Sequence, residues 1–170
     1  PERMDIIKWI NRILSWEPNA RIVLHGVSMG AATVLMASGE DLPENVKAVI
    51  ADCGYTSEWD EFQREADTLH IPWFPVLNAT SVLSKVRDGY DFKQASALAQ
   101  VKKSRIPTLF IHGSSDELVP YSMLGELYAA AACEKEELTV EGAGHALSSS
   151  VAPTLYWRTV EDFIAKYLDR

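Results

Sequence analysis

The sequence predicts an α/β fold in which a mostly parallel sheet is covered by helices on both faces. Two observations support this fold class. Four short apolar runs, at residues 21–26, 46–53, 108–113 and 136–140, are typical of strands that are buried on both faces. Helical patterns alternate with these runs along the chain, and this alternation is the arrangement that produces a parallel sheet.

Three of the helical patterns are clear. The stretch MDIIKWINRILSW, residues 4–16, is amphipathic, and Pro18 follows its end. The apolar face of this predicted helix consists of Ile6, Ile10, Ile13 and Leu14. Residues 29–40 follow the first strand directly and are rich in small side chains, which predicts a helix that packs closely on the sheet. The tail, residues 154–170, is predicted to be a second amphipathic helix.

The length of 170 residues predicts a single domain, residues 1–170. One segment, at about 55–104, is too long for an ordinary crossover between two strands. We interpret it as helices plus an insertion that carries exposed aromatic residues, Trp73 and Phe74, and that covers a pocket as a cap or lid. A crossover helix with an additional surface helix explains the segment equally well.

Composition argues against several classes of function. A net charge of −8 and a pI of about 5.0 disfavour binding to nucleic acid or to anionic membrane surfaces, because both need clustered basic residues. No apolar run approaches the length of a membrane span. Cys53 and Cys133 are far apart, and Cys53 is predicted to be a small buried apolar residue. Neither they nor the four histidines show the spacing of metal ligands, so we expect no metal and no cofactor.

The stretch GVSMG, residues 26–30, fits the pattern G-x-S-x-G. The pattern alone is weak, but here it follows a buried strand and opens a helix, which is the setting of a nucleophile elbow. Such a turn presents the serine, Ser28, in a strained backbone conformation. The residues two positions before and after it come close together, so Gly26 and Gly30 are expected to be small for steric reasons.

A serine hydroxyl needs a base to become a nucleophile, and the base needs an acid to orient it. Asp116 follows the third predicted strand and His145 follows the fourth. The carboxyl ends of parallel strands form the edge where open α/β sheets build their sites. We therefore expect Ser28, Asp116 and His145 to converge there, in the chain order Ser, Asp, His.

Other residues are alternatives for these roles. Glu117 is next to Asp116, and Asp52 ends the second strand, so either can be the acid. Among the other histidines, His25 is interpreted as a packed strand residue and His112 as a residue that orients a loop. His70 lies in the expected cap without a visible partner.

The motifs LHGVSMGAATVLMA, TLFIHGSSDELVP and EGAGHALS together resemble those of the α/β-hydrolase superfamily. Residues 89–113 further resemble a bacterial branch of esterase-like serine hydrolases, and the resemblance covers nearly the whole chain. It implies that Ser28 is the nucleophile, that His145 is the general base and then the general acid, and that Asp116 orients His145. It also implies that the backbone N–H of Met29 is one donor of the oxyanion hole.

The central sheet of that superfamily usually has about eight strands, and the motifs match the last four. We therefore expect a partial fold, the C-terminal half, in which the second oxyanion donor belongs to the other half. The strand at 22–24 would then have a bare apolar edge, which predicts self-association. Because one oxyanion donor would be absent, the chain alone is expected to be weakly active or inactive.

The sequence thus predicts a serine hydrolase that cleaves a small-molecule carboxylic ester, thioester or amide through an acyl-serine intermediate. A peptidase, acyltransferase or perhydrolase can use the same triad. A binding module with a hydrolase fold, which holds a partner at Trp73 and Phe74, is the non-catalytic alternative. The compartment stays open, because the composition suits the cytoplasm whereas the branch that the chain resembles often has an N-terminal membrane anchor.

Overall fold

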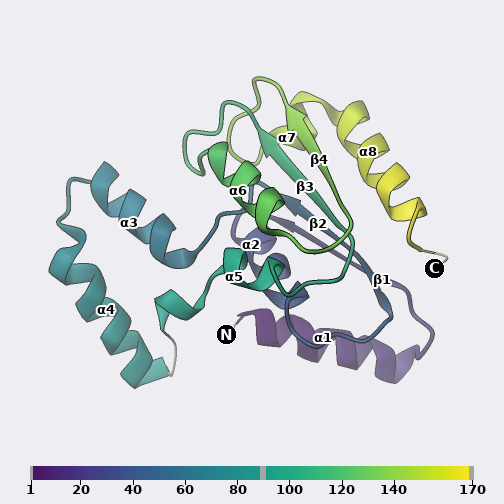
Figure 1. The fold of residues 1–170 in the computed structure, drawn as a ribbon, viewed down its shortest axis with the longest axis horizontal. Coiled ribbons are helices and arrows are strands. Elements are labelled where there is room, and N and C mark those ends of the chain that lie inside the picture. Colours follow the sequence, from purple (N-terminus) through teal and green to yellow (C-terminus); the bar gives the residue numbers. More distant parts are fainter. Residues whose placement is uncertain (1, 89–90, 169–170) are drawn as a thin grey trace.

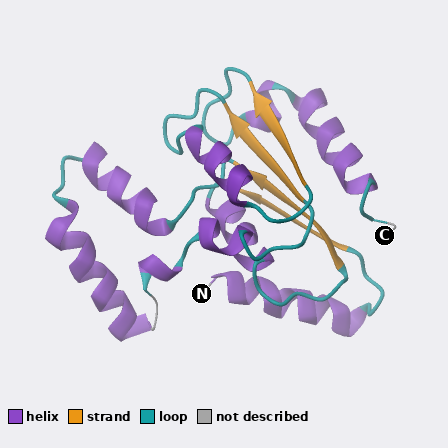
Figure 2. Ribbon diagram, viewed as in Figure 1, coloured by secondary structure: helices purple, strands orange, loops and turns teal. Residues whose placement is uncertain are grey.

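The computed structural model describes residues 2–88 and 91–168, and within them a four-stranded parallel sheet forms the centre (Figure 1). The strands lie side by side in the order β1-β2-β3-β4. Their bounds are Ile22–Val27 for β1, Val46–Asp52 for β2, Thr108–Gly113 for β3 and Lys135–Val140 for β4. Figure 2 shows that all four arrowheads point toward the same edge. The predicted fold class is confirmed.

One face of the sheet is covered by four helices and holds the larger core. These helices are α1 (Glu2–Trp16), α2 (Met29–Ser38), α5 (Ala97–Val101) and α6 (Ser122–Ala130). Ile10 of α1 is buried, and the other three residues of its predicted apolar face pack against the same core, so the predicted orientation of this helix is confirmed. Alternating strand residues, such as Val49 and Phe110, point into this layer.

The opposite face is covered by α8 (Pro153–Ala165), which follows the short helix α7 (Ser148–Val151) (Figure 1). Tyr156, Val160 and Phe163 of α8 are buried against Ile50 and Ile111 of the sheet. The predicted tail helix therefore exists, but it ends at Ala165. The last two residues of that prediction, 169–170, lie outside the described residues.

The segment between β2 and β3 contains α3 (Glu58–Thr68), α4 (Trp73–Asp88), the 3-10 turn η1 (Phe92–Gln94) and α5. Figure 1 shows α3 and α4 extending together away from the sheet, whereas α5 packs into the core. Ser57 is the N-cap of α3, because its Oγ accepts the N–H of Asp60 at 3.0 Å. Phe74 is exposed as predicted, but Trp73 is half-buried because it packs between the two helices.

None of the helices in residues 2–88 and 91–168 has the length and apolar character needed to cross a membrane.

Candidate active site

Ser28 occupies the single residue between β1 and α2, and its backbone is in the left-handed region, with φ 56° and ψ −118°. A residue with a side chain rarely adopts such a φ, so the surrounding structure must hold it there. The Ser28 N–H donates to the carbonyl of Asp52 at 2.8 Å, which ties the turn to the end of β2. The sequence therefore folds as the strained elbow that the motif predicts.

Gly26 and Gly30 differ in what their positions require. A Cβ on Gly26 would overlap the backbone carbonyl of Gly30 and approach the N atom of Ala31 to 2.6 Å, so this position needs glycine. A Cβ on Gly30 would meet no heavy atom of the described chain within 4 Å beyond its own helix and sequence neighbours. The expectation that Gly30 is small for steric reasons is wrong. The close approach is one-sided, because Gly30 contributes its backbone to the contact while its Cα faces open space.

His145 lies in the loop that follows β4, with Gly142 at φ 73° and Ala146 at φ 57° on either side of it. Its Nε2 lies 2.7 Å from Ser28 Oγ, although 117 residues of sequence separate the two. About a fifth of the His145 side chain is exposed, whereas the carboxyl group on its other side is fully buried. The imidazole thus stands between the interior and the accessible serine.

Asp116 holds the other ring nitrogen, because its Oδ2 lies 2.8 Å from His145 Nδ1. A carboxylate accepts, so Nδ1 carries the proton, Nε2 is left as the acceptor, and the Ser28 hydroxyl donates to it. Asp116 Oδ1 accepts two backbone N–H groups, from Leu118 at 3.0 Å and Val119 at 2.9 Å. The structure therefore brings the three predicted residues together in one hydrogen-bonded chain.

His112 fixes the loop that carries Asp116. Its Nε2 donates to the carbonyl of Val119 at 3.0 Å and lies 3.3 Å from Asp116 Oδ2. The side chains of His112 and Asp116 are both almost completely buried. His112 is thus placed as the loop-orienting residue that the sequence indicates.

The residues that the sequence offers as alternatives to Asp116 and His145 do not contact Ser28 through their side chains in any hydrogen bond of the described residues. Glu117 points to solvent, and the Asp52 carboxyl is buried against Ser148 and Tyr156. Burial raises the pKa of Asp52, and the hydrogen bonds from Ser148 and Tyr156 oppose that rise. His25 contacts the same tyrosine, with 2.9 Å between its Nε2 and the phenol oxygen.

The remaining alternative base, His70, is exposed at the end of α3, where its Nδ1 donates to the carbonyl of Thr68 at 3.1 Å. These contacts leave Asp116 and His145 as the hydrogen-bonded acid and base of Ser28.

Cys53 lies beneath the site, and its thiol is one of three groups that are close enough to hold a metal ion. Its sulfur, one carboxylate oxygen of Asp116 and one ring nitrogen of His145 lie within 4.8 Å of one another. Cys53 is fully buried, as predicted, and burial raises the pKa of its thiol to about 12, so the sulfur keeps its proton at neutral pH. A protonated thiol is a poor metal ligand, and the hydrogen bond between Asp116 Oδ2 and His145 Nδ1 already occupies that ring nitrogen, so the group suits hydrogen bonding better than metal ligation.

Glu61, in the first turns of α3, is a residue that the sequence did not single out. Its Oε2 is buried, and no hydrogen-bond donor of the described residues reaches it. Burial raises the pKa of Glu61, and the charge of Arg64 on the same helix opposes that rise. No local pattern in the sequence indicates that this carboxylate oxygen is buried.

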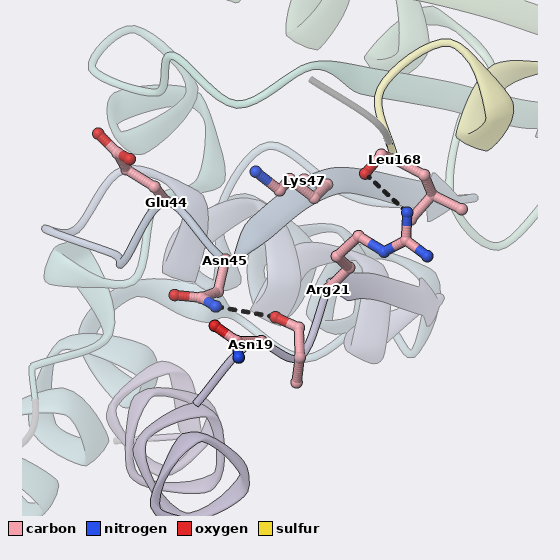
Figure 3. A pocket seen from close by; sticks show the side chains of 7 residues that line it. Asn19, Arg21, Glu44, Asn45, Lys47 and Leu168 are labelled. Carbon is pink, nitrogen blue, oxygen red and sulfur yellow. Dashed lines mark hydrogen bonds between the residues drawn. The ribbon is translucent and has the colours of Figure 1, made fainter. Parts of the chain in front are cut away.

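Several cavities lie away from the hydrogen-bonded chain, and two of them differ clearly in character, one being polar and one apolar. The first is an open polar pocket between the starts of β1 and β2, at the opposite edge of the sheet, and its volume is about 430 Å³. Figure 3 shows the side chains that line it. Two of its polar side chains are already engaged, because Asn45 donates to the carbonyl of Ala20 at 2.9 Å and Arg21 donates to that of Leu168 at 3.4 Å. The second is an apolar groove of about 290 Å³ between α3 and α4.

Known proteins are similar to this chain in sequence and in fold. A model of the prolyl oligopeptidase family matches residues 3–170. The uncharacterized protein YqkD of Bacillus subtilis is 32% identical over 168 residues, which cover 96% of this chain and 54% of YqkD. The chain spans about half the length of the curated relatives that it matches.

Two solved structures show the fold. The acylaminoacyl peptidase of Pyrococcus horikoshii superposes with a TM-score of 0.72 at 19% identity, over 99% of this chain and 28% of that protein. The Pyrococcus furiosus esterase Pf2001 superposes with a TM-score of 0.73 at 18% identity, over 98% of this chain and 62% of the esterase.

Proposed function

The chain belongs to the prolyl oligopeptidase family and has the α/β-hydrolase fold, and on this premise we propose that it acts as a serine hydrolase on carboxylic esters. The observation that carries the proposal is the hydrogen-bonded chain from Ser28 Oγ through His145 to Asp116, with distances of 2.7 and 2.8 Å. A nucleophile, a base and an orienting acid within hydrogen-bond reach are the elements that acyl transfer through serine requires.

In the first half-reaction, Ser28 Oγ attacks the ester carbonyl carbon while its proton passes to His145 Nε2. The carbonyl π-electrons move to the oxygen, which becomes a tetrahedral oxyanion. Asp116 then faces a positively charged imidazolium, and this pairing stabilises the charge that the proton transfer creates. When the carbonyl re-forms, the C–O bond to the leaving group breaks, and the departing alkoxide takes the proton from Nε2.

The second half-reaction repeats these steps with water. His145 Nε2 accepts a proton from the water as its oxygen attacks the acyl-serine carbon. Collapse of the second oxyanion breaks the bond to Ser28 Oγ, which recovers its proton from Nε2. The carboxylic acid leaves, and the enzyme returns to its starting state.

The oxyanion is proposed to bind the backbone N–H of Met29. Met29 is the first residue of α2, where helix N–H groups have no carbonyl partner within the helix and the helix dipole is positive. It directly follows the nucleophile, so its N–H lies next to the carbon under attack. The proposal needs a second donor, and we assign it to a loop that is not among residues 2–88 and 91–168.

The hairpin of α3 and α4 is proposed to act as a cap over this site. Five residues separate it from the end of β2, and that end lies at the site because the carbonyl of Asp52 accepts the N–H of Ser28 at 2.8 Å. The groove between the two helices is almost entirely apolar. A cap of this kind would exclude water from the reacting groups.

Peptide or amide cleavage is a second candidate, favoured by the family description and by the likeness to an acylaminoacyl peptidase. The same triad serves both reactions, because both pass through an acyl-serine. Turnover of a short-chain p-nitrophenyl ester against that of an N-acylated dipeptide, measured with the full-length protein, separates the two.

Labelling with a fluorophosphonate probe tests the serine mechanism. Intact mass spectrometry is expected to show one adduct on the full-length protein and none on its Ser28→Ala variant. Ser150→Ala is the matched control and is expected to keep the adduct. Equal labelling of Ser28→Ala and the unaltered protein would overturn the assignment of the nucleophile.

A further inference from the structure

We propose that Cys53 is a positioning residue for the proposed reaction. Its thiol fills the buried space beside the Asp116–His145 pair without offering a strong hydrogen-bond donor, so the carboxylate keeps its hydrogen bond for the imidazole. The inference rests on the proposed function in taking His145 as the base of Ser28. It adds a side chain that the steps of that mechanism do not use.

The backbone fixes the place of Cys53. The residue follows β2 directly, and its φ of 47° lies in the left-handed region. A residue with a side chain rarely adopts this φ, so the surrounding structure must hold it there. Its N–H donates to the carbonyl of Ile111 on β3 at 2.8 Å, and the preceding carbonyl, that of Asp52, accepts the N–H of Ser28 at 2.8 Å. Cys53 is therefore tied both to the elbow and to the strand that precedes Asp116.

The sulfur of Cys53 lies close to both the acid and the base. It stands within 4.8 Å of an oxygen of the Asp116 carboxylate and of a ring nitrogen of His145. Cys53 and the side chain of Asp116 have no exposed surface, whereas about a fifth of the His145 side chain is exposed. The thiol therefore contributes to the dry, interior surroundings of the pair.

The Asp116 carboxylate has an acceptor position left on Oδ2. A carboxylate offers about four lone pairs to donors. Oδ1 accepts the N–H groups of Leu118 and Val119, and Oδ2 accepts His145 Nδ1–H at 2.8 Å. His112 Nε2 lies 3.3 Å from Oδ2 but donates to the carbonyl of Val119. Within the part of the chain that the structure describes, the hydrogen-bonded partner of Oδ2 is thus the base alone.

A thiol suits the space beside this open position. It is a weak hydrogen-bond donor, and burial raises the pKa of Cys53 to about 12, so the sulfur stays uncharged at neutral pH. A hydroxyl group or a water molecule there would donate to Oδ2 and draw negative charge away from the imidazole. The imidazolium that forms when Ser28 attacks would then be held less strongly. Cys53 is therefore expected to support the basicity of His145 by excluding other donors.

Two substitutions bring a donor to this position. Cys53→Ser adds a hydroxyl, and serine is compatible with the backbone because Ser28 has a φ of 56°. Cys53→Gly suits the positive φ and leaves room for a water, which occupies about 30 Å³. The rate of fluorophosphonate labelling of the full-length protein is measured against pH. In both variants the pH at half-maximal rate is expected to fall by about 0.4–1, because His145 loses its proton more readily, and the plateau rate is expected to fall about 2–10-fold.

Cys133→Ser is the matched control. The thiol of Cys133 is half-buried and donates to Thr108 Oγ1 at 3.6 Å, at the start of β3 and away from the site. This variant is expected to keep both values. The other titratable side chains of these strand ends, Asp52 and His112, are present in every variant, so a difference reports on position 53.

A merely structural role would lower the stability of the variants and leave the pH at half-maximal rate unchanged. That result in both Cys53→Ser and Cys53→Gly, with urea unfolding showing that the proteins are folded, overturns the proposal. An equal shift in Cys133→Ser also overturns it, because the effect would then not depend on the place of Cys53.

Nuclear magnetic resonance separates this inference from the proposed function. The nitrogen signals of the His145 imidazole report its protonation without any turnover. The pH midpoint of their change is expected to be lower in both variants than in the unaltered full-length protein. If the probe labels no serine of the unaltered protein, the proposed function fails. The inference about Cys53 is then judged on these midpoints, and equal midpoints in all the proteins overturn it.

Discussion

Asp52 accepts hydrogen bonds from Ser28 and from Ser148, which lie on opposite sides of the candidate site. Its carboxyl oxygen Oδ1 accepts the hydroxyl of Ser148 at 3.1 Å, and its backbone carbonyl accepts the N–H of Ser28 at 2.8 Å. Ser148 begins α7, three residues after His145. One residue at the end of β2 therefore connects the turn that carries the proposed nucleophile with the segment that follows the proposed base.

Because the Asp52 carboxyl is buried, the free energy of unfolding is expected to depend on pH. The pKa of this carboxyl is raised in the folded state, so the folded protein holds the proton more tightly than the unfolded chain does. The contribution of Asp52 to stability therefore falls as pH rises from the ordinary value of 3.8 through the raised folded value. Asp52→Asn, measured by urea unfolding at several pH values, should gain stability relative to the unaltered protein as pH increases through this window.

Glu161→Gln is the control for this experiment, because Glu161 is exposed on α8. It should run parallel to the unaltered protein across the same pH range. A stability difference for Asp52→Asn that stays constant with pH would contradict the prediction.

Asp116→Asn should abolish most of the activity and leave the fold intact. An amide N–H facing His145 Nδ1 would favour the wrong tautomer, with the proton on Nε2, so that Ser28 loses its acceptor. We expect a fall in kcat of about 10⁴-fold, measured with an ester substrate of the full-length protein. Glu117→Gln, at the adjacent exposed position, should change kcat little, and a larger loss there than in Asp116→Asn would reassign the acid.

The two glycines of the elbow should respond differently to alanine. Gly26→Ala places a Cβ against the carbonyl of Gly30, and we expect it to lower the free energy of unfolding by about 1–3 kcal/mol. Gly30→Ala meets open space, and because alanine is the better helix former it should be neutral or stabilise by up to about 1 kcal/mol. Denaturant unfolding of both variants checks this, and equal destabilisation would refute the one-sided contact.

The edge strand β1 should make the 170-residue chain self-associate. No strand lies beyond β1 within the described residues, and Val27 on it is exposed. Light scattering at micromolar concentration should report dimers or larger species, and Val27→Lys should reduce them, because charged residues on an edge oppose strand pairing. Val82→Lys replaces a valine of α4 that is more exposed than Val27, 62% against 43%, and should leave association unchanged. A monomeric unaltered chain would exclude edge pairing.

The features that the sequence predicts are those with local signals. The four strands, α1, α2 and α8 follow from apolar periodicity, and the positions of Ser28 and His145 follow from short motifs at strand ends. Helix α6 was missed, because its nine residues include Gly125 and present only three buried side chains. The burial of the Glu61 carboxylate oxygen depends on how the segment after β2 folds, and no spacing within that segment encodes it.

The strand order also sets the time at which the site is completed during synthesis. Each strand pairs with its predecessor along the chain, so the sheet grows from one side as the polypeptide leaves the ribosome. Ser28 precedes its hydrogen-bond partner by 117 residues, an interval of about 6–23 s at ordinary rates of translation. During that interval Ser28 lacks the imidazole that the proposed mechanism requires, so under that mechanism the site forms only after the last strand and its loop have emerged.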